Sequence, residues 1–345
     1  MNTRKNELIE RLQNVGPKFG ELYTNSEIID KSKDLQTEIA NCIFEKTHAE
    51  HINSKDVRNY VRGLASEYGF EGDETFVRLD KNLSELGYTI ASFIKGMKGE
   101  RVAKNALKIL QYDDDVRILY NVALEDDESK TEYDAIVVTP YGLFVVEVKN
   151  WNGNLVLDKH GLLHKEDGNG AQYDVPGRLN MKEFLLREYL GEAFPGCFNS
   201  ILLFPNNGVK LKDEFEEITI CFGGAIVNTI RSNRDNGIKL SAEQVDNIES
   251  ILRASHKEQL TEYKVNTDEL IADFADLIER IENKADTVHQ VETDSVCDNK
   301  KERIVAVKKT RPSWVDVVAD VAGLAACVGL SFVLTGSPVK MARFL

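Results

Sequence analysis

Residues 132–153, EYDAIVVTPYGLFVVEVKNWNG, are the most informative stretch of this 345-residue sequence. Two nearly continuous apolar runs, 135–138 and 143–146, are typical of strands that are buried on both faces. Between them, residues 139–142 (TPYG) have Pro at the second position and Gly at the fourth, as tight turns often do. The stretch therefore predicts an antiparallel hairpin inside a sheet.

Three charged residues, Asp134, Glu147 and Lys149, stand together at the end of this hairpin that lies away from the turn. Because residues i and i+2 of a strand share a face, Glu147 and Lys149 are expected to point the same way. If the loop has two residues, Asp134 lies directly opposite Glu147, about 5 Å away. If Gly142 instead forms a bulge, the register shifts by one residue. The sequence is compatible with both turns.

The chemistry of this charged group depends on whether a cation joins its carboxylates. Two carboxylates buried side by side cost free energy unless they share one. Ligands that are all oxygen suit Mg²⁺ or Mn²⁺ better than Zn²⁺. A nearby lysine can orient an attacking water and stabilise charge on a phosphoryl oxygen. The group therefore has the composition of a metal-assisted phosphodiester hydrolase site, and an ion pair that merely closes the hairpin is the alternative.

The residues around the hairpin resemble the nuclease-related domain (NERD) family, a branch of the PD-(D/E)xK, restriction-endonuclease-like superfamily. The matching elements are Gly99-Glu100 at a helix start, Asp134 followed by IVVTP-x-G, and FVVE-V-KNW-x-G ending at Gly153. The resemblance covers about residues 95–255. It implies an α/β fold with a restriction-endonuclease-like core, in which helices flank a mixed central sheet.

The resemblance also implies a function, that of a divalent-metal-dependent nuclease that hydrolyses phosphodiester bonds. DNA is favoured over RNA as its substrate. Asp134 and Glu147 would bind Mg²⁺ or Mn²⁺, and the backbone carbonyl of Val148 would complete the metal shell. Lys149 would serve the attacking water, and Glu100 would add a further acidic group. The alternative is a catalytically inactive nuclease-like module that binds nucleic acid or a protein partner.

The sequence departs from the family pattern at two places. The family often has His or another polar residue after the Asp, where this sequence has Ala135. It also tends to place Gln early in the next helix, just after a Pro. After Pro176 this sequence offers Arg178 or Asn180 instead, and Lys182 lies on the same predicted helix. These three residues are candidates for contact with substrate phosphates, and a solvated helix face is the alternative.

Further elements surround the hairpin in an order that predicts an α/β or mixed-sheet domain over residues 96–255. A helix precedes residue 110, and the sequence SAEQ at 241–244 is a capping box that starts another helix. The other predicted elements are strands over 116–124, 200–204 and 218–222, a hairpin over 154–165 and a helix over 178–190.

The overall composition limits the classes of protein and partner. Lys and Arg number 43 and Asp and Glu 57, so the net charge of −14 argues against coating nucleic acid through bulk charge, although a local basic groove is allowed. Five scattered cysteines without a CxxC pair argue against a disulfide framework or zinc cluster, and favour the cytoplasm. The polar start predicts no signal peptide, and no Walker A motif indicates an ATPase.

Both flanks of the predicted domain are expected to be mainly helical. Residues 1–95 read as a helical region to which the sequence assigns no role. Residues 256–285 predict an amphipathic helix with one apolar stripe. Residues 286–312 are polar and predict a linker, and residues 313–345 form a hydrophobic C-terminal tail.

The tail carries no charge over residues 321–339, a length close to that of a hydrocarbon core. We expect one hydrophobic helix over residues 313–339. Asp316 and Asp320 limit how deep its first turns can lie in lipid. Membrane contact and packing against the N-terminal helices or within an oligomer are the two interpretations, with packing slightly favoured. The oligomeric state does not follow from the sequence.

Overall fold

The computed structural model describes residues 3–47, 53–125, 130–168, 170–194, 196, 198–206, 208–235 and 237–297. The chain divides into two units, Met1–Ala285 and Asp286–Leu345, and the fold described below is that of the first. The predicted hydrophobic tail lies outside the described residues. No helix among the described residues combines the length and the apolar character needed to cross a membrane.

The centre of the fold is a mixed five-stranded sheet with the order β10-β8-β4-β3-β2. Its strands are β2 (Arg117–Glu125), β3 (Lys130–Thr139), β4 (Gly142–Val148), β8 (Phe198–Phe204) and β10 (Thr219–Phe222). Strands β2, β3 and β4 are antiparallel neighbours, whereas β8 is parallel to both β4 and β10. This arrangement confirms the predicted α/β class with a mixed central sheet.

The hairpin of β3 and β4 has a two-residue loop, because Thr139 pairs with Gly142 and Ala135 with Val146. The buried Thr139 hydroxyl stabilises this turn: it donates to the carbonyl of Gly142 at 2.9 Å and accepts the N–H of Tyr141 at 3.2 Å. The register therefore follows the first of the two predicted turns, in which the position of Asp134 faces that of Glu147.

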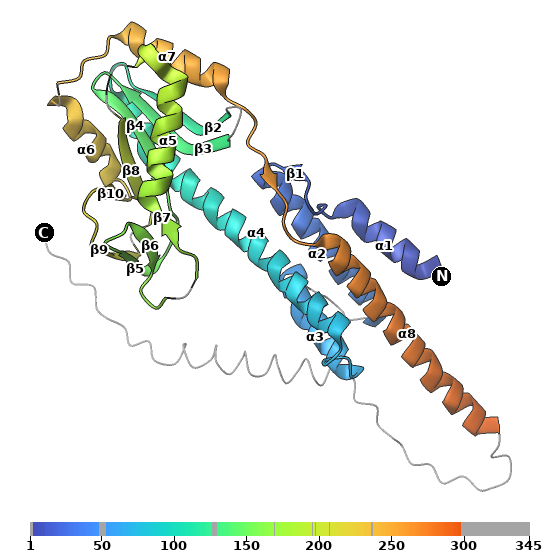
Figure 1. Cartoon of the computed structure of the whole chain (residues 1–345). Helices are drawn as coiled ribbons and strands as arrows, with labels where there is room; N and C mark the ends of the chain where they lie inside the picture. The colour runs from blue at the N-terminus through green and yellow to red at the C-terminus, as the bar shows by residue number, and fades with distance from the viewer. Residues whose placement is uncertain are drawn as a thin grey trace, which may run out of the picture. The chain divides into compact units, whose positions relative to one another are not determined.

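Helices cover both faces of this sheet (Figure 1). Helices α4 (Glu74–Leu107) and α6 (Ala225–Arg231) pack on one face, and α5 (Val175–Leu190) and α7 (Ala242–Ser255) on the other. The α4-side cluster includes Leu107, Val137, Phe144, Val146 and Ile230. The α5-side cluster includes Tyr133, Ile136, Val145, Leu186 and Val245. The predicted capping box is present at the start of α7, with Ser241 and Gln244 each bonded to the other's backbone N–H.

A second, four-stranded sheet with the order β7-β6-β5-β9 follows the hairpin. Its strands are β5 (Gly153–Leu157), β6 (Leu162–Lys165), β7 (Tyr173–Asp174) and β9 (Val209–Asp213). The predicted hairpin over 154–165 is β5 and β6. The sequence did not predict β7, which has two residues, or β9, which is weakly apolar and pairs with the distant strand β5.

The N-terminal region is helical, as predicted. It contains α1 (Thr3–Val15), α2 (Asn25–Thr47) and α3 (Val57–Glu67), and these pack with the first half of α4 and with α8 (Thr267–Cys297). This helical cluster includes Leu12, Ile28, Leu79, Leu86 and Phe274. Short 3₁₀ helices lie at Ser54–Asp56, Lys108–Tyr112, Gly191–Ala193 and Ser232–Asp235.

Helix α4 crosses the expected boundary between residues 95 and 96 without a break. Leu79 and Leu86 are buried in the helical cluster, whereas Ala103 and Leu107 are buried in the α4-side cluster. One continuous helix of 34 residues therefore belongs to both regions. Since its apolar side chains contribute to two cores, the predicted boundary at 95 does not mark a break in the secondary structure.

The predicted helix over 256–285 differs from the structure at both ends. Strand β11 (Thr261–Glu262) pairs with β1 (Leu22–Tyr23), and Tyr263 and Val265 are buried in the helical cluster, so α8 begins only at Thr267. The helix then continues beyond Ala285 to Cys297, into the segment predicted as a linker. Polar composition predicted a linker there, but a polar segment that extends an established helix needs no apolar stripe of its own.

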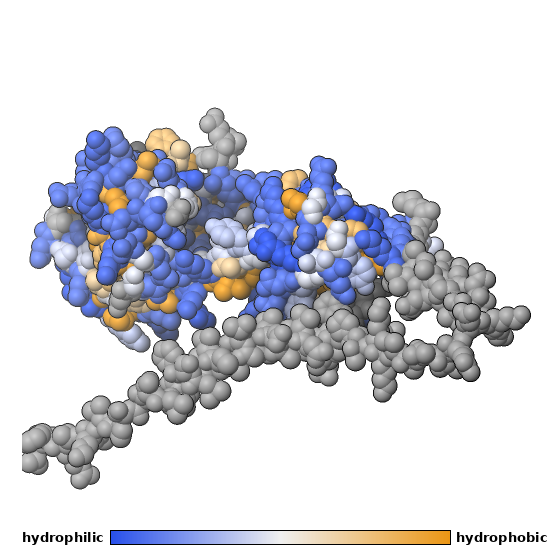
Figure 2. All heavy atoms as spheres, turned by 90° about the horizontal axis from the view of Figure 1, so that it is seen from below, coloured by the Kyte–Doolittle hydropathy of each residue, from blue (hydrophilic) through white to orange (hydrophobic). Residues whose placement is uncertain are grey.

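The visible face in Figure 2 is mainly hydrophilic, with scattered apolar side chains. This agrees with a sequence in which 29% of residues are charged. Isolated apolar side chains on a surface are normal for folded proteins.

Candidate active site

Glu147 lies near the end of β4 and is only 4% exposed. Lys149, two residues further on and on the same side as predicted, places its Nζ 2.7 Å from Glu147 Oε1. The hydroxyl of Tyr173 donates to the same oxygen at 2.6 Å. Lys182 of α5 forms an ion pair with Oε2. Both carboxylate oxygens are therefore held by donors from three different segments.

These partners decide the ionisation of Glu147. Burial alone would raise the pKa of its carboxyl group, but the positive charges of Lys182 and Lys149 outweigh burial and lower the pKa. Glu147 is therefore ionised at neutral pH. Such a charge is tolerable in a buried position because its hydrogen bonds and ion pairs replace its hydration.

Two tyrosines hold the lysines in place. The Nζ of Lys149 lies 3.8 Å from the centre of the Tyr173 ring, and the Nζ of Lys182 lies 5.6 Å from that of Tyr133. The Tyr133 hydroxyl donates to the carbonyl of Lys182 at 2.8 Å, which ties α5 to β3. Burial raises the pKa of both phenols, so both remain protonated hydrogen-bond donors.

Asp134 lies across the hairpin from Glu147. Its Oδ2 accepts the backbone N–H of Val148 at 2.6 Å, a contact that links the end of β4 to β3. Burial and the negative charge of Glu147 raise the pKa of Asp134, against the opposing effect of Lys182. The two carboxylates are thus close enough to interact, and their repulsion contributes to the raised pKa of Asp134.

The alternation of side chains between the two faces of the sheet is interrupted at Asp134. Tyr133 and Ile136 both belong to the α5-side cluster although they are three residues apart, so the alternation of faces is interrupted between them. Asn121 of β2 lies opposite Asp134 in the register and has a φ of 52°. Asn is among the residues that tolerate this left-handed conformation. The interruption lets Asp134 reach the surface of a cavity.

Glu100 approaches Asp134 from α4. A side-chain hydrogen bond joins it to Asn121, and burial together with the charge of Glu132 raises its pKa. The preceding residue permits this approach: a Cβ on Gly99 would lie 2.5 Å from the Cβ of Asn150. The Asn150 side chain in turn donates to the carbonyl of Lys95 at 2.6 Å. Gly99 therefore lets α4 pack directly against the segment that follows Lys149.

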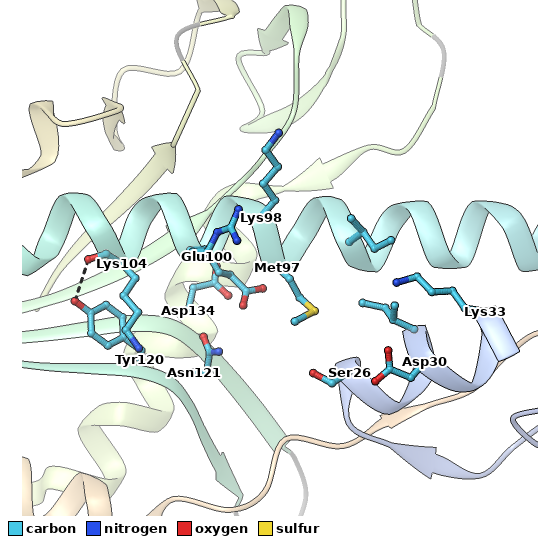
Figure 3. A pocket seen from close by; sticks show the side chains of 13 residues that line it. Ser26, Asp30, Lys33, Met97, Lys98, Glu100, Lys104, Tyr120, Asn121 and Asp134 are labelled. Atoms are coloured by element: carbon cyan, nitrogen blue, oxygen red, sulfur yellow. Dashed lines mark hydrogen bonds between the residues drawn. The ribbon is translucent and has the colours of Figure 1, made fainter. Parts of the chain in front are cut away.

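Figure 3 shows Glu100, Asn121 and Asp134 close together in a cavity, between Tyr120 and Met97. The cavity has a volume of about 590 Å³ and lies between α2, α4 and β2. Glu147 is not part of its lining. The two carboxylates of the hairpin therefore differ in access, since only Asp134 faces this cavity.

The candidate substrate contacts on α5 are distributed unevenly. Lys182 forms an ion pair with Glu147. Arg178 and Asn180 are both exposed, and Asn180 lines a different cavity of about 300 Å³ together with Ser200 and Thr219. The structure thus brings Asp134, Glu147, Lys149, Glu100 and Lys182 to one region, with the Val148 backbone between them, and leaves Asn180 outside it.

The site also includes residues that sequence reasoning missed. Tyr173 and Tyr133 hold the lysines, and Asn121 binds Glu100. Nothing in their spacing marks them, because each acts through a neighbour that is distant in sequence. The one local signal is Asn121, a polar residue inside an otherwise apolar strand sequence, RILYNVALE.

The donor set suits a hard divalent cation. Adjacent carboxylates with all-oxygen ligands are typical of Mg²⁺ and Mn²⁺ sites. Burial and the charge of Glu147 both raise the pKa of Asp134, and a bound cation would favour its ionised form. Across the described part of the chain, no group of three or more His, Cys, Asp or Glu side chains is arranged to hold a metal. A cation here would therefore need backbone or water oxygens besides the two hairpin carboxylates.

Comparison with known proteins adds one finding. Residues 95–205 match the sequence model of the nuclease-related domain. No curated protein shows significant similarity to the chain. The same is true of the solved structures. The matched residues contain α4 from Lys95 onward, the hairpin, α5 and β8, and so the charged group of Glu100, Asp134, Glu147, Lys149 and Lys182.

Proposed function

We propose, from the premise that this chain carries a nuclease-related domain, that it is a divalent-metal-dependent nuclease. The family indicates a nuclease-related function, contact with nucleic acid and use of a divalent metal. The proposal goes further in naming hydrolysis of phosphodiester bonds, with Mg²⁺ or Mn²⁺, and in favouring DNA over RNA as the substrate. It rests on one observation above all, the convergence of Asp134, Glu147 and Lys149 within the matched residues.

Each residue of the site would have a separate role in the reaction. Asp134, Glu147 and the carbonyl of Val148 would hold the metal, which when bound would neutralise charge that develops on the phosphate. Lys149, fixed above the Tyr173 ring, would orient the attacking water. Lys182 would keep Glu147 ionised, and Glu100 would bind or position water on the cavity side. Arg178 is exposed near the start of α5 and would contact the nucleic acid backbone.

An inactive module is the second candidate, and a specific observation favours it. Both oxygens of Glu147 already have partners, so a metal must compete with Tyr173, Lys149 or Lys182 for one of them. A site whose carboxylate is already neutralised needs no cation for its stability. In that case the group of charges would stabilise the hairpin, and the domain would bind nucleic acid or protein without cleaving it.

A cleavage assay separates the two candidates. The full chain is incubated with linear and plasmid DNA, single-stranded DNA and RNA, in Mg²⁺, in Mn²⁺ and in EDTA. We expect metal-dependent cleavage that falls by at least about 100-fold in Glu147→Gln. Glu188→Gln, an exposed carboxylate on α5, is the matched control and should retain activity.

Two results would contradict the proposal: the absence of cleavage under every condition, or cleavage by Glu147→Gln at the rate of the unaltered chain. Calorimetric titration with Mn²⁺ adds a measurement that does not depend on turnover. The nuclease proposal expects a binding site that Asp134→Asn removes and Glu188→Gln keeps.

A further inference from the structure

The cavity beside Asp134 has one wall that lies outside the nuclease-related residues. Ser26, Asp30 and Lys33 of α2 line it opposite α4, whereas the family match begins only at residue 95. Figure 3 shows these three side chains at the end of the cavity away from Glu100, with Met97 between the two groups. The N-terminal helical region, to which the sequence assigned no role, therefore forms part of the surroundings of the site.

Packing fixes this wall relative to Asp134. Ile28 of α2 and Leu86 of α4 are buried in the same helical cluster. Helix α4 continues without interruption to Leu107, which is buried against the central sheet. Because both ends of α4 lie in packed cores, α2 is held beside the cavity by tertiary packing of two elements.

The cavity offers apolar surface next to the carboxylates. Ile94 and Met97 of α4 are 42% and 37% exposed, although both are large apolar side chains, and they line the cavity together with Tyr120. Nucleobases that leave a stack are bound by contact with apolar and aromatic side chains. A wall of this kind adjacent to a phosphate-cleaving site is suited to a base.

The lining of the cavity has charges of both signs, and its basic residues are Lys33, Lys98, Arg101 and Lys104, beside the carboxylates of Asp30, Glu100 and Asp134. Within the described part of the chain, Lys33 and Arg101 form neither an ion pair nor a hydrogen bond through their side chains. The Nζ of Lys104 lies 5.0 Å from the centre of the Tyr120 ring. In a chain with a net charge of −14, cations left without carboxylate partners around one cavity can bind phosphates of a strand that passes it.

We infer that the cavity binds one unstacked nucleotide, so that the substrate of this site is single-stranded nucleic acid or an unpaired strand end. The inference rests on the proposed nuclease function and deepens it. A volume of about 590 Å³ is that of a pocket for one small molecule. A paired base must be unstacked to enter such a pocket, at a cost that is least for strands that are already single.

Cleavage of matched substrates tests this preference. One labelled sequence is supplied as a single strand, as a blunt duplex and as a duplex with a single-stranded overhang, in DNA and in RNA form. We expect the single strand and the overhang to be cut at least about ten-fold faster than the blunt duplex. Equal or faster cleavage of the blunt duplex would overturn the inference and leave the nuclease proposal intact.

Two pairs of variants test the walls of the cavity. Met97→Asn removes apolar contact at the site, and Val77→Asn is its control, since Val77 is 57% exposed on the same helix but does not line the cavity. Lys33→Gln removes the cation of α2, with the exposed Lys55→Gln as control. We expect Met97→Asn to raise KM for the single strand about five- to ten-fold with little change in kcat. Both controls should behave as the unaltered chain.

A binding measurement keeps the inference testable even if no substrate is cut. Fluorescence anisotropy of the labelled strands is measured in EDTA, which prevents cleavage, with the unaltered full-length chain and with its Met97→Asn and Val77→Asn variants. Preferential binding of the single strand, weakened by Met97→Asn only, supports the inference. Equal binding of the duplex, equal effects of both substitutions or no binding of any strand would overturn it. Selective binding without cleavage by the unaltered chain would contradict the nuclease proposal alone.

Discussion

The two carboxylates of the hairpin occupy contrasting surroundings. The closed side consists of Glu147 with Lys149, Tyr173 and Lys182, whose donors satisfy both of its oxygens. The open side consists of Asp134, Glu100 and Asn121, which face a cavity. The charge of Glu147 is neutralised by neighbouring lysines, whereas Asp134 has one backbone donor and a raised pKa.

This difference shows how one pair of strands can stabilise the charge of one carboxylate, Glu147, while the carboxylate opposite it, Asp134, has few partners. The lysines lower the pKa of Glu147, whereas burial, together with the charge of the ionised Glu147, raises the pKa of Asp134. Asp134 therefore gives up its proton only near neutral pH, on the side where a cation and a substrate would have access. Four predictions test the contrast, in order of decreasing expected effect.

The largest effect is expected from neutralising each carboxylate in turn. Glu147→Gln removes the ion-pair partner of Lys149 and Lys182, which are both partly buried, and should lower the free energy of unfolding by about 3 kcal/mol. Asp134→Asn removes repulsion and keeps an acceptor for Val148 N–H, so its unfolding free energy should stay equal or rise. Chemical denaturation of both variants without metal measures this. Equal destabilisation by the two would refute the contrast between closed and open sides.

A smaller effect is expected at the contact between α4 and the segment after Lys149. Gly99→Ala places a Cβ against Asn150 and should lower the free energy of unfolding by about 1–3 kcal/mol. Gly96→Ala lies on the same helix, where a Cβ would approach nothing closer than 4.0 Å, and should raise it by about 0.5–1 kcal/mol. Thermal unfolding compares the pair. A stabilising Gly99→Ala would mean that the close packing of α4 is not required.

The free energy of unfolding should depend on pH because the pKa of Asp134 is raised in the folded chain. The pKa of Asp134 is raised to about 7 in the folded chain, from an ordinary value near 4. A raised carboxyl pKa stabilises the fold at low pH, and this contribution is lost as the pH rises from about 4 to about 7. We expect a loss on the order of 1 kcal/mol, because solvent in the cavity screens the charge.

The measurement compares the unaltered chain with Asp134→Asn across that pH range, in EDTA and in saturating Mg²⁺. In EDTA the unaltered chain should lose stability relative to the variant as the pH rises. Bound Mg²⁺ should abolish or reverse this trend. A flat difference in EDTA would contradict the raised pKa.

The smallest effect on stability is expected from Asn121→Gly. Glycine adopts the left-handed conformation of this residue without strain, so the free energy of unfolding should change by less than about 1 kcal/mol. Glu100 loses its side-chain partner, however, so the rate of cleavage should fall several-fold. Unfolding and cleavage measured on one preparation separate the two effects. A loss of stability as large as that of Glu147→Gln would assign Asn121 a structural role.

Much of the fold followed from local patterns in the sequence. The apolar runs and the TPYG turn predicted the hairpin, and the Ser241 capping box predicted the start of α7, because these features depend on neighbours within a few residues. The register with a two-residue loop was one of two predicted alternatives. The hydrogen bonds of Thr139 across the turn stabilise the alternative that the structure adopts.

The sequence by itself determined which acidic and basic groups meet at the end of the hairpin, since strand periodicity places Glu147 and Lys149 on one side and Asp134 opposite. Only the tertiary structure decided how these groups differ. Tyr173 and Lys182 reach Glu147 from 26 and 35 residues away, and α2 reaches the cavity only because α4 runs unbroken between two cores. Such contacts depend on the path of the whole chain, which local propensity does not encode.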